Sequence, residues 1–149
     1  MNSELCSLVY FSRSTIPADQ ADAEILKILE SARKQNPKVD VTGALLYSGN
    51  YFAQVLEGPF DAVQSTFERI RMDARHAEVS VLSCKPIDSR NFAQWSMAYA
   101  TPASRITPST MINGLLENPS CIDCDELGTE IVTVLQMLIS GGESMSAQQ

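Results

Sequence analysis

The order in which two hydrophobic periods alternate along residues 5–100 limits the fold more than any other feature of the sequence. A period of two residues predicts a strand, and a period near 3.6 predicts a helix. These periods predict strands at 5–12, 41–48, 51–57, 78–87 and 94–100, and helices at 18–35 and 60–74. Two helices with one apolar face each bury those faces best side by side on an antiparallel-rich sheet. We therefore expect an α+β, ferredoxin-like β-α-β-β-α-β-β fold with both helices on one face.

Short turn-forming and helix-ending sequences support these boundaries. Gly49-Asn50, between the second and third strands, is typical of a two-residue hairpin turn. Asn36-Pro37 ends the first helix, because the residue before a proline avoids the helical region.

Beyond residue 101 the pattern changes to two further helices. They are predicted at 107–117 and 126–139, and Gly141-Gly142 ends the second. We expect both to cover the other face of the sheet, and the polar tail that follows to fray. We therefore expect a domain over 1–101 and a C-terminal helical extension over 102–149.

Composition restricts the location and the partners. The net charge of −7 is unfavourable for binding nucleic acid or anionic membranes. The sequence shows neither a secretion signal nor the roughly 18 apolar residues of a spanning helix. Cys6, Cys84, Cys121 and Cys124 are scattered, which is typical of reduced thiols, so we expect a cytoplasmic protein. Cys121 and Cys124 have the spacing of half a metal site, but no second pair exists and His76 is the single histidine, so we predict no metal.

Two polar side chains are predicted to be buried in the sheet. Alternation places Gln54 between Phe52 and Leu56 on an apolar face, and it places Tyr10 on the same face as Leu8. A buried amide without partners costs on the order of 1–3 kcal/mol, so both groups need hydrogen bonds. From the residues alone, Tyr10 and Gln54 bond either each other or nearby backbone groups.

The two predicted helices carry further polar residues on their inner faces. Ala32 and Asn36 lie four apart near the end of the first helix, and Arg69 and Asp73 lie four apart on the second. The second pair is either a surface ion pair or part of a slot between the helices. Such a slot would suit a flat, mostly apolar ring with a few polar edge atoms, for example an isoalloxazine.

Trp95 and Met97 are predicted to share one face of the last strand with Tyr99. From the alternation alone, they belong either to the core or to a site.

Several motifs together resemble one known family. They are LVYFSRS around Tyr10, NPKVDVTGALLYSGNYFAQVLEG from Asn36, RIRMDARH from Arg69 and RNFAQWSMAY from Arg90. In this order and spacing, residues 5–100 strongly resemble the BLUF domain, a blue-light sensor that uses FAD.

The resemblance implies a role for each candidate residue. Tyr10 would donate an electron and a proton to the excited flavin, and Gln54 would lie between Tyr10 and the flavin's N5 and C4 carbonyl edge. Asn36 would bond the ring's carbonyl edge, and Trp95 and Met97 would be the switch positions of the last strand. The remaining contacts would be polar ones from Arg69, Asp73 and His76 and packing ones from Ile28, Phe52 and Ile70. Many relatives have a serine at the position of Ala32, so one hydrogen bond near the reactive edge is in question.

The resemblance also implies a photoreceptor and not an enzyme. We expect FAD, with FMN or riboflavin as alternatives, a downstream signalling protein as partner, and a homo-oligomer. An alternative function is a small acylphosphatase-like hydrolase, but such a site needs a glycine-rich loop and residues 13–22 contain no glycine. A third possibility is a regulatory module that senses a small molecule without photochemistry.

Overall fold

The computed structural model describes residues 4–100 and 124–141. The elements follow the predicted order: β1 (Leu5–Ser14), η1 (Ala18–Gln20), α1 (Ala21–Gln35), η2 (Asn36–Val39), β2 (Thr42–Tyr47), β3 (Tyr51–Pro59), α2 (Phe60–Arg71), β4 (His76–Pro86), β5 (Ala98–Ala100) and α4 (Cys124–Gly141). The strands form one sheet in the order β4-β1-β3-β2-β5, with β5 parallel to β2 and the other neighbours antiparallel. The predicted α+β, ferredoxin-like arrangement is confirmed.

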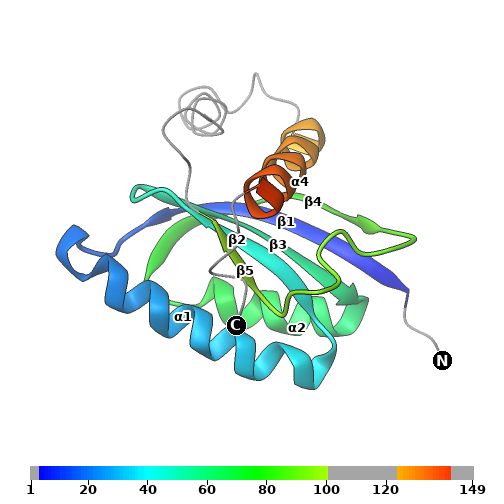
Figure 1. Ribbon diagram of the computed structural model, residues 1–149, viewed down its shortest axis with the longest axis horizontal. Helices are drawn as coiled ribbons and strands as arrows, with labels where there is room; N and C mark the ends of the chain where they lie inside the picture. Colours follow the sequence, from blue (N-terminus) through cyan, green and yellow to red (C-terminus); the bar gives the residue numbers. More distant parts are fainter. Residues whose placement is uncertain (1–3, 101–123, 142–149) are drawn as a thin grey trace.

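The sheet separates two apolar layers (Figure 1). Helices α1 and α2 lie side by side on one face, and α4 crosses the opposite face. Strand alternation sorts the core as predicted. The layer under α1 and α2 includes Leu8, Tyr10, Phe52, Leu56 and Met97. The layer under α4 includes Val9, Phe11, Val55, Ile131 and Leu135.

Helix α4 confirms one of the two predicted C-terminal helices. Ile131 and Leu135 lie four apart, are almost fully buried, and seat the helix on the sheet. Gly128 allows a close approach to β4, because a Cβ at this position would lie 2.9 Å from Ser83 Oγ. The helix predicted at 107–117 and the frayed tail lie outside the described residues. Within the described part of the chain, no helix has both the length and the apolarity needed to cross a bilayer.

The last strand is shorter than predicted. The sequence suggested a strand over 94–100, whereas β5 covers Ala98–Ala100 and residues 87–97 form an irregular loop. The physical reason is that backbone groups before Ala98 bond outside a strand ladder. Trp95 O accepts the Gly43 N–H at 3.1 Å, and Ser96 O accepts the Asn36 side-chain amide at 2.9 Å.

Candidate functional site

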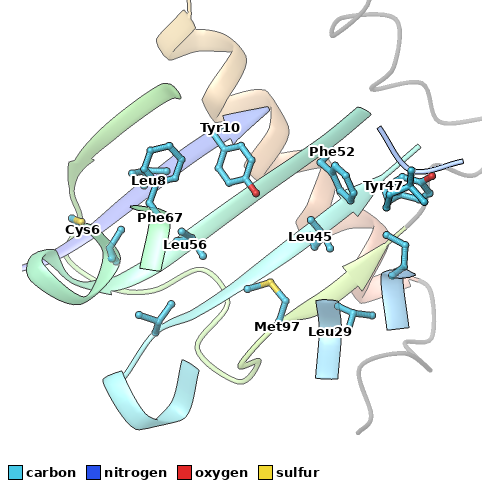
Figure 2. Close-up of a cluster of buried hydrophobic side chains, with 14 residues drawn as sticks. Cys6, Leu8, Tyr10, Leu29, Leu45, Tyr47, Phe52, Leu56, Phe67 and Met97 are labelled. Carbon is cyan, nitrogen blue, oxygen red and sulfur yellow. The ribbon is translucent and has the colours of Figure 1, made fainter. Parts of the chain in front are cut away.

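A cleft opens between α1 and α2 above the sheet. Its empty space is about 750 Å³ with the open mouth included. All the side chains predicted to bind a cofactor line it: Tyr10, Ile28, Ala32, Asn36, Phe52, Gln54, Arg69, Ile70, Asp73 and His76. The slot inferred from helix spacing is therefore present. Tyr10, Phe52 and Met97 lie together on the face of the sheet that forms its floor (Figure 2).

Tyr10 and Gln54 form the centre of this floor. They are direct partners in the antiparallel register of β1 and β3, and their side chains are 2% and 4% exposed. Tyr10 Oη donates a hydrogen bond to Gln54 Oε1 at 2.5 Å. Of the partners left open by the sequence, the structure therefore has these two side chains bonded to each other. Burial, with the nearby Asp73 charge adding to it, raises the pKa of the Tyr10 phenol well above its ordinary value.

Gln54 keeps hydrogen-bonding capacity that the protein uses weakly. Its Nε2 donates to Met97 Sδ at 3.3 Å, and a thioether sulfur is a weak acceptor. An amide carries two N–H donors, and the described residues provide Gln54 with no other acceptor. A buried side chain with an unused donor at the floor of a cleft is suited to a ligand that presents a carbonyl or a ring nitrogen.

Met97 and Trp95 lie on opposite sides of the sheet. Met97 is 2% exposed and lines the cleft, whereas Trp95 packs against the core layer under α4. The prediction that both share one strand face with Tyr99 is wrong for Trp95, since Tyr99 packs in the layer of Met97. The alternation was applied to a strand, but residues 94–97 are not in one.

The loop that carries Met97 is held from α1 and η2. Arg33 Nε donates to Met97 O at 3.0 Å, and Asn36 Nδ2 donates to Ser96 O at 2.9 Å. Asn36, at 3% exposure, is buried as predicted for a site residue. Arg33 was missed by the sequence analysis, because it lies in the basic last turn of α1, where a cation is expected for the helix dipole alone.

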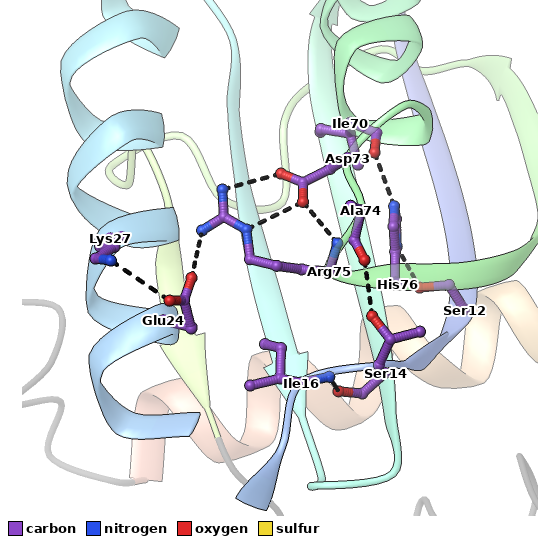
Figure 3. A network of polar contacts seen from close by, with 11 residues as sticks. Ser12, Ser14, Ile16, Glu24, Lys27, Ile70, Asp73, Ala74, Arg75 and His76 are labelled. Carbon is purple, nitrogen blue, oxygen red and sulfur yellow. Dashed lines mark hydrogen bonds and ion pairs between the residues drawn. The ribbon is translucent and has the colours of Figure 1, made fainter. Parts of the chain in front are cut away.

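Charged residues close one end of the cleft (Figure 3). Arg75 lies between Asp73, whose carboxylate accepts from Nε and Nη2 at 3.0 Å each, and Glu24 of α1, at 3.4 Å from Nη1. Of the two possibilities left open for Arg69 and Asp73, the structure has both lining the cleft and not paired with each other, because α2 ends at Arg71 and Asp73 turns to Arg75. Arg69 lines the cleft with no ion-pair partner among the described residues. Burial opposes ionisation of Asp73, but the hydrogen bonds from Arg75 outweigh it and lower the carboxyl pKa.

His76 is held by the protein through both ring nitrogens. Nε2 lies 2.7 Å from Ile70 O and Nδ1 lies 2.6 Å from Ser12 Oγ (Figure 3). A carbonyl oxygen only accepts, so Nε2 carries a proton and donates it to Ile70 O. The ring also stands edge-on to Tyr10 and Phe52, with centroids 6.1 and 6.0 Å away. In this arrangement His76 shapes the wall of the cleft and has no free nitrogen for a polar contact.

Thr66 is a lining residue that the sequence analysis missed. Its side chain is 3% exposed, and its hydroxyl has no hydrogen-bond partner among the described residues. A buried, unpaired hydroxyl is costly unless a ligand completes its bonding. Thr66 lies three and four residues before Arg69 and Ile70, so the helical period that placed those two in the slot could have found it.

Comparison with known proteins gives one consistent result. The family model for sensors of blue light using FAD, BLUF, matches residues 5–98. Photoactivated adenylate cyclase subunit beta of Euglena longa is 37% identical over 101 residues, or 67% of this chain and 12% of that protein. The blue light- and temperature-regulated antirepressor BluF of Escherichia coli strain K12 is 36% identical over 93 residues, or 62% of this chain and 23% of that protein. The chain thus spans a small part of the length of these relatives.

Solved structures match over most of the chain. The dark-state structure of BlrB, a BLUF protein, has 34% identity and a TM-score of 0.71, covering 91% of this chain and 100% of its own. Ground-state BlsA has 28% identity and a TM-score of 0.75, covering 89% of this chain and 88% of its own.

Proposed function

Because the chain belongs to the BLUF family of blue-light sensors that use FAD, we propose that it binds an oxidised flavin non-covalently between α1 and α2. The observation that carries this proposal is the buried Tyr10–Gln54 hydrogen bond at the floor of the cleft, beside an unused N–H donor of the Gln54 amide. Among the described residues, the Thr66 hydroxyl has no hydrogen-bond partner and the Arg69 guanidinium has no ion-pair partner, and these groups also suit the polar edge and the negative charges of such a ligand.

A bound oxidised flavin supplies absorption of blue light and, when excited, an oxidant for a nearby phenol. The chain supplies the proton chemistry. The raised pKa keeps Tyr10 protonated in the dark, and Gln54 Oε1, already its hydrogen-bond acceptor, is placed to receive the proton of an oxidised phenol. Rotation or tautomerisation of the Gln54 amide then changes what this side chain offers to its neighbours, because it carries donors and acceptors on one group. The bond to Met97 Sδ is the first to change, since it uses the same amide.

The other lining residues bind and orient the ring. Ile28, Ala32, Phe52 and Ile70 provide apolar surface, and Asn36, Arg69 and Asp73 provide polar groups at the ends of the cleft. We propose FAD in preference to FMN or riboflavin, in agreement with the description of the family model. Ala32 lacks the hydroxyl of the serine that many relatives have at this position. The nearest hydroxyl on α1 is that of Ser31, which also lines the cleft.

We further propose that the chain is a sensor without enzymatic activity of its own, because the family is one of sensors and the switch turns over no substrate. The hydrolase alternative receives no support from the matched relatives. Two of those relatives are named as a cyclase subunit and an antirepressor. By analogy, the output would be a second protein or another copy of this chain that responds to α4 and the extension 102–149. Free thiols at Cys6 and Cys84 support a cytoplasmic location.

Absorption spectroscopy tests the proposed function. The purified protein should be yellow, and blue light should shift its flavin band to the red by a small, reversible amount. Flavin released by denaturation and separated by chromatography identifies FAD, FMN or riboflavin. A protein that takes up no flavin, or a flavin band that bleaches in place of shifting, would contradict the proposal. Tyr10→Phe, which removes the hydroxyl and keeps the ring, should abolish the shift while flavin stays bound.

A further inference from the structure

Glu57 is a buried acidic residue on the same strand as Gln54. It lies on β3, three residues after Gln54, and its side chain points to the opposite face of the sheet, toward α4. It is 0% exposed. Burying a carboxylate is costly unless hydrogen bonds replace its hydration, so its partners identify the part of the molecule that it stabilises.

Those partners are neighbouring residues of the irregular loop 87–97. The Asn91 backbone N–H lies 2.9 Å from Oε1 and 3.0 Å from Oε2 of Glu57, and the Phe92 N–H lies 2.9 Å from Oε1. The Asn91 side-chain Nδ2 donates to Oε2 at 3.0 Å. Glu57 therefore fastens one end of this loop to the middle of the sheet with several charge-assisted hydrogen bonds.

The other end of the same loop is fastened to the cleft. Phe92 O accepts the Trp95 N–H at 3.1 Å, and Trp95 O accepts the Gly43 N–H at 3.1 Å. Two residues later, Met97 Sδ accepts from Gln54 Nε2 at 3.3 Å. This hydrogen bond is weaker than those at Phe92 O and Trp95 O, because sulfur is a poor acceptor. It is made by Gln54, the side chain whose bonding changes in light under the proposed function.

Helix α4 contacts the loop at the Glu57 end. Gln136 Nε2 donates to Asn91 Oδ1 at 3.3 Å. Phe92, 2% exposed, packs in one apolar cluster with Ile131 and Leu135 of α4. Asn91 is thus bonded to Glu57 through one atom of its amide and to α4 through the other.

We propose that Glu57 is a positioning residue that makes loop 91–97 a relay from Gln54 to α4. The loop backbone is held at both ends, by Glu57 at Asn91 and Phe92 and by Arg33 and Asn36 at Met97 and Ser96. The weak link is the one from Gln54 to Met97 Sδ. When the Gln54 amide changes its bonding, the Met97 side chain moves, the loop between the two attachments rearranges, and Asn91 and Phe92 carry the change to α4. Without Glu57 the loop moves freely and α4 keeps its dark position. This inference rests on the proposed function, since it takes the light-driven change at Gln54 as its start.

Hydrogen exchange of the flavin-loaded protein in light and dark, recorded beside its absorption spectrum, tests the relay. In the wild type, light should shift the flavin band and change amide exchange in both 91–97 and α4. Glu57→Gln presents an NH₂ group to the loop's N–H donors and breaks part of the attachment. This variant should keep the red shift and lose the light-dependent change in α4. A full α4 response in Glu57→Gln overturns the inference.

Two further variants complete the design. Gln136→Ala removes the hydrogen bond from α4 to Asn91 and leaves the packing of Phe92 in place. It should keep the red shift and the response of 91–97 and weaken the response of α4. It carries the same test if Glu57→Gln does not fold, and an undiminished α4 response overturns the inference there too. Glu78→Gln makes the same chemical change at an exposed acid paired with Arg13 and should leave every readout unchanged. If the wild type shows the red shift but no light-dependent change in the amide exchange of α4, the relay alone is overturned. If the wild type shows no red shift, the proposed function is refuted and the relay with it.

Discussion

Replacing Thr66 by valine should weaken flavin binding while relieving a local cost in the flavin-free protein. Valine has nearly the same shape as threonine and differs by a methyl group in place of the hydroxyl. The Thr66 side chain is 3% exposed on the α2 side of the cleft, and its hydroxyl has no partner among the described residues. The variant therefore removes one polar atom from the wall of the cleft and leaves its shape intact.

The magnitude follows from the burial of that atom. A hydrogen bond between neutral groups contributes ~0.5–1.5 kcal/mol net, and 1.4 kcal/mol is a tenfold change in affinity, so the dissociation constant should rise roughly two- to twelve-fold. In the absence of flavin the same hydroxyl is buried and unpaired, at a cost of about 1–3 kcal/mol, so Thr66→Val should not destabilise the flavin-free protein. Opposite signs in the two states are the signature of a group reserved for a ligand.

Diluting the flavin-loaded protein and following the fluorescence of released flavin measures the dissociation constant. Thr66→Ser is the matched control, because it keeps the hydroxyl and loses the methyl group. Its affinity should stay close to that of the wild type. Binding by Thr66→Val that is as tight as in the wild type would refute the assignment of this hydroxyl to the ligand.

Three other consequences follow from the structure. Gly43→Ala should abolish folding, measured by circular dichroism and soluble yield, because its Cβ would lie 2.0 Å from Val55 O; a folded variant would show that β2 and β3 can separate. Burial raises the pKa of Tyr10, so the stability that the protonated phenol contributes is complete below about pH 10 and is lost as the pH rises further. Denaturant titrations at alkaline pH will detect this loss. Equal stability of Tyr10→Phe and the wild type across that range would contradict the prediction. Burial opposes ionisation of Asp73, but the hydrogen bonds from Arg75 outweigh it and lower the pKa of this carboxyl. The stability that this pair contributes is therefore present above about pH 4 and is lost below it. Arg75→Gln should reduce the loss of stability in acid, and an unchanged loss would contradict the pairing.

Strand alternation made Tyr10 and Gln54 predictable as a pair. The period of two placed each side chain on an apolar face of its own strand, and in the structure both lie on the face under α1 and α2. Sequence could not supply the register that makes them direct partners, because register depends on the pairing of β1 with β3 across intervening elements. The helical period likewise placed Ala32 and Asn36 beside a cleft, since their spacing survives in α1 and η2.

Prediction failed where regular structure ends. Trp95 was assigned by alternation to the face of Met97, but the loop before β5 has no period. Asp73 was placed on the second helix with Arg69, but α2 ends before it. Glu57 follows the alternation of β3, yet its partners lie in that same loop, whose course local patterns do not encode. In each case long-range contacts replace the local repeat on which the reasoning depended.

The light-minus-dark absorption spectrum of Gln54→Leu, recorded with flavin bound, tests the central claim most directly. Leucine fills similar space but offers neither the acceptor for Tyr10 Oη nor the donor for Met97 Sδ. If the Gln54 amide is the switch, illumination will leave no red-shifted product in this variant, whereas the wild type will shift and recover in the dark. A normal, reversible red shift in Gln54→Leu would contradict the account.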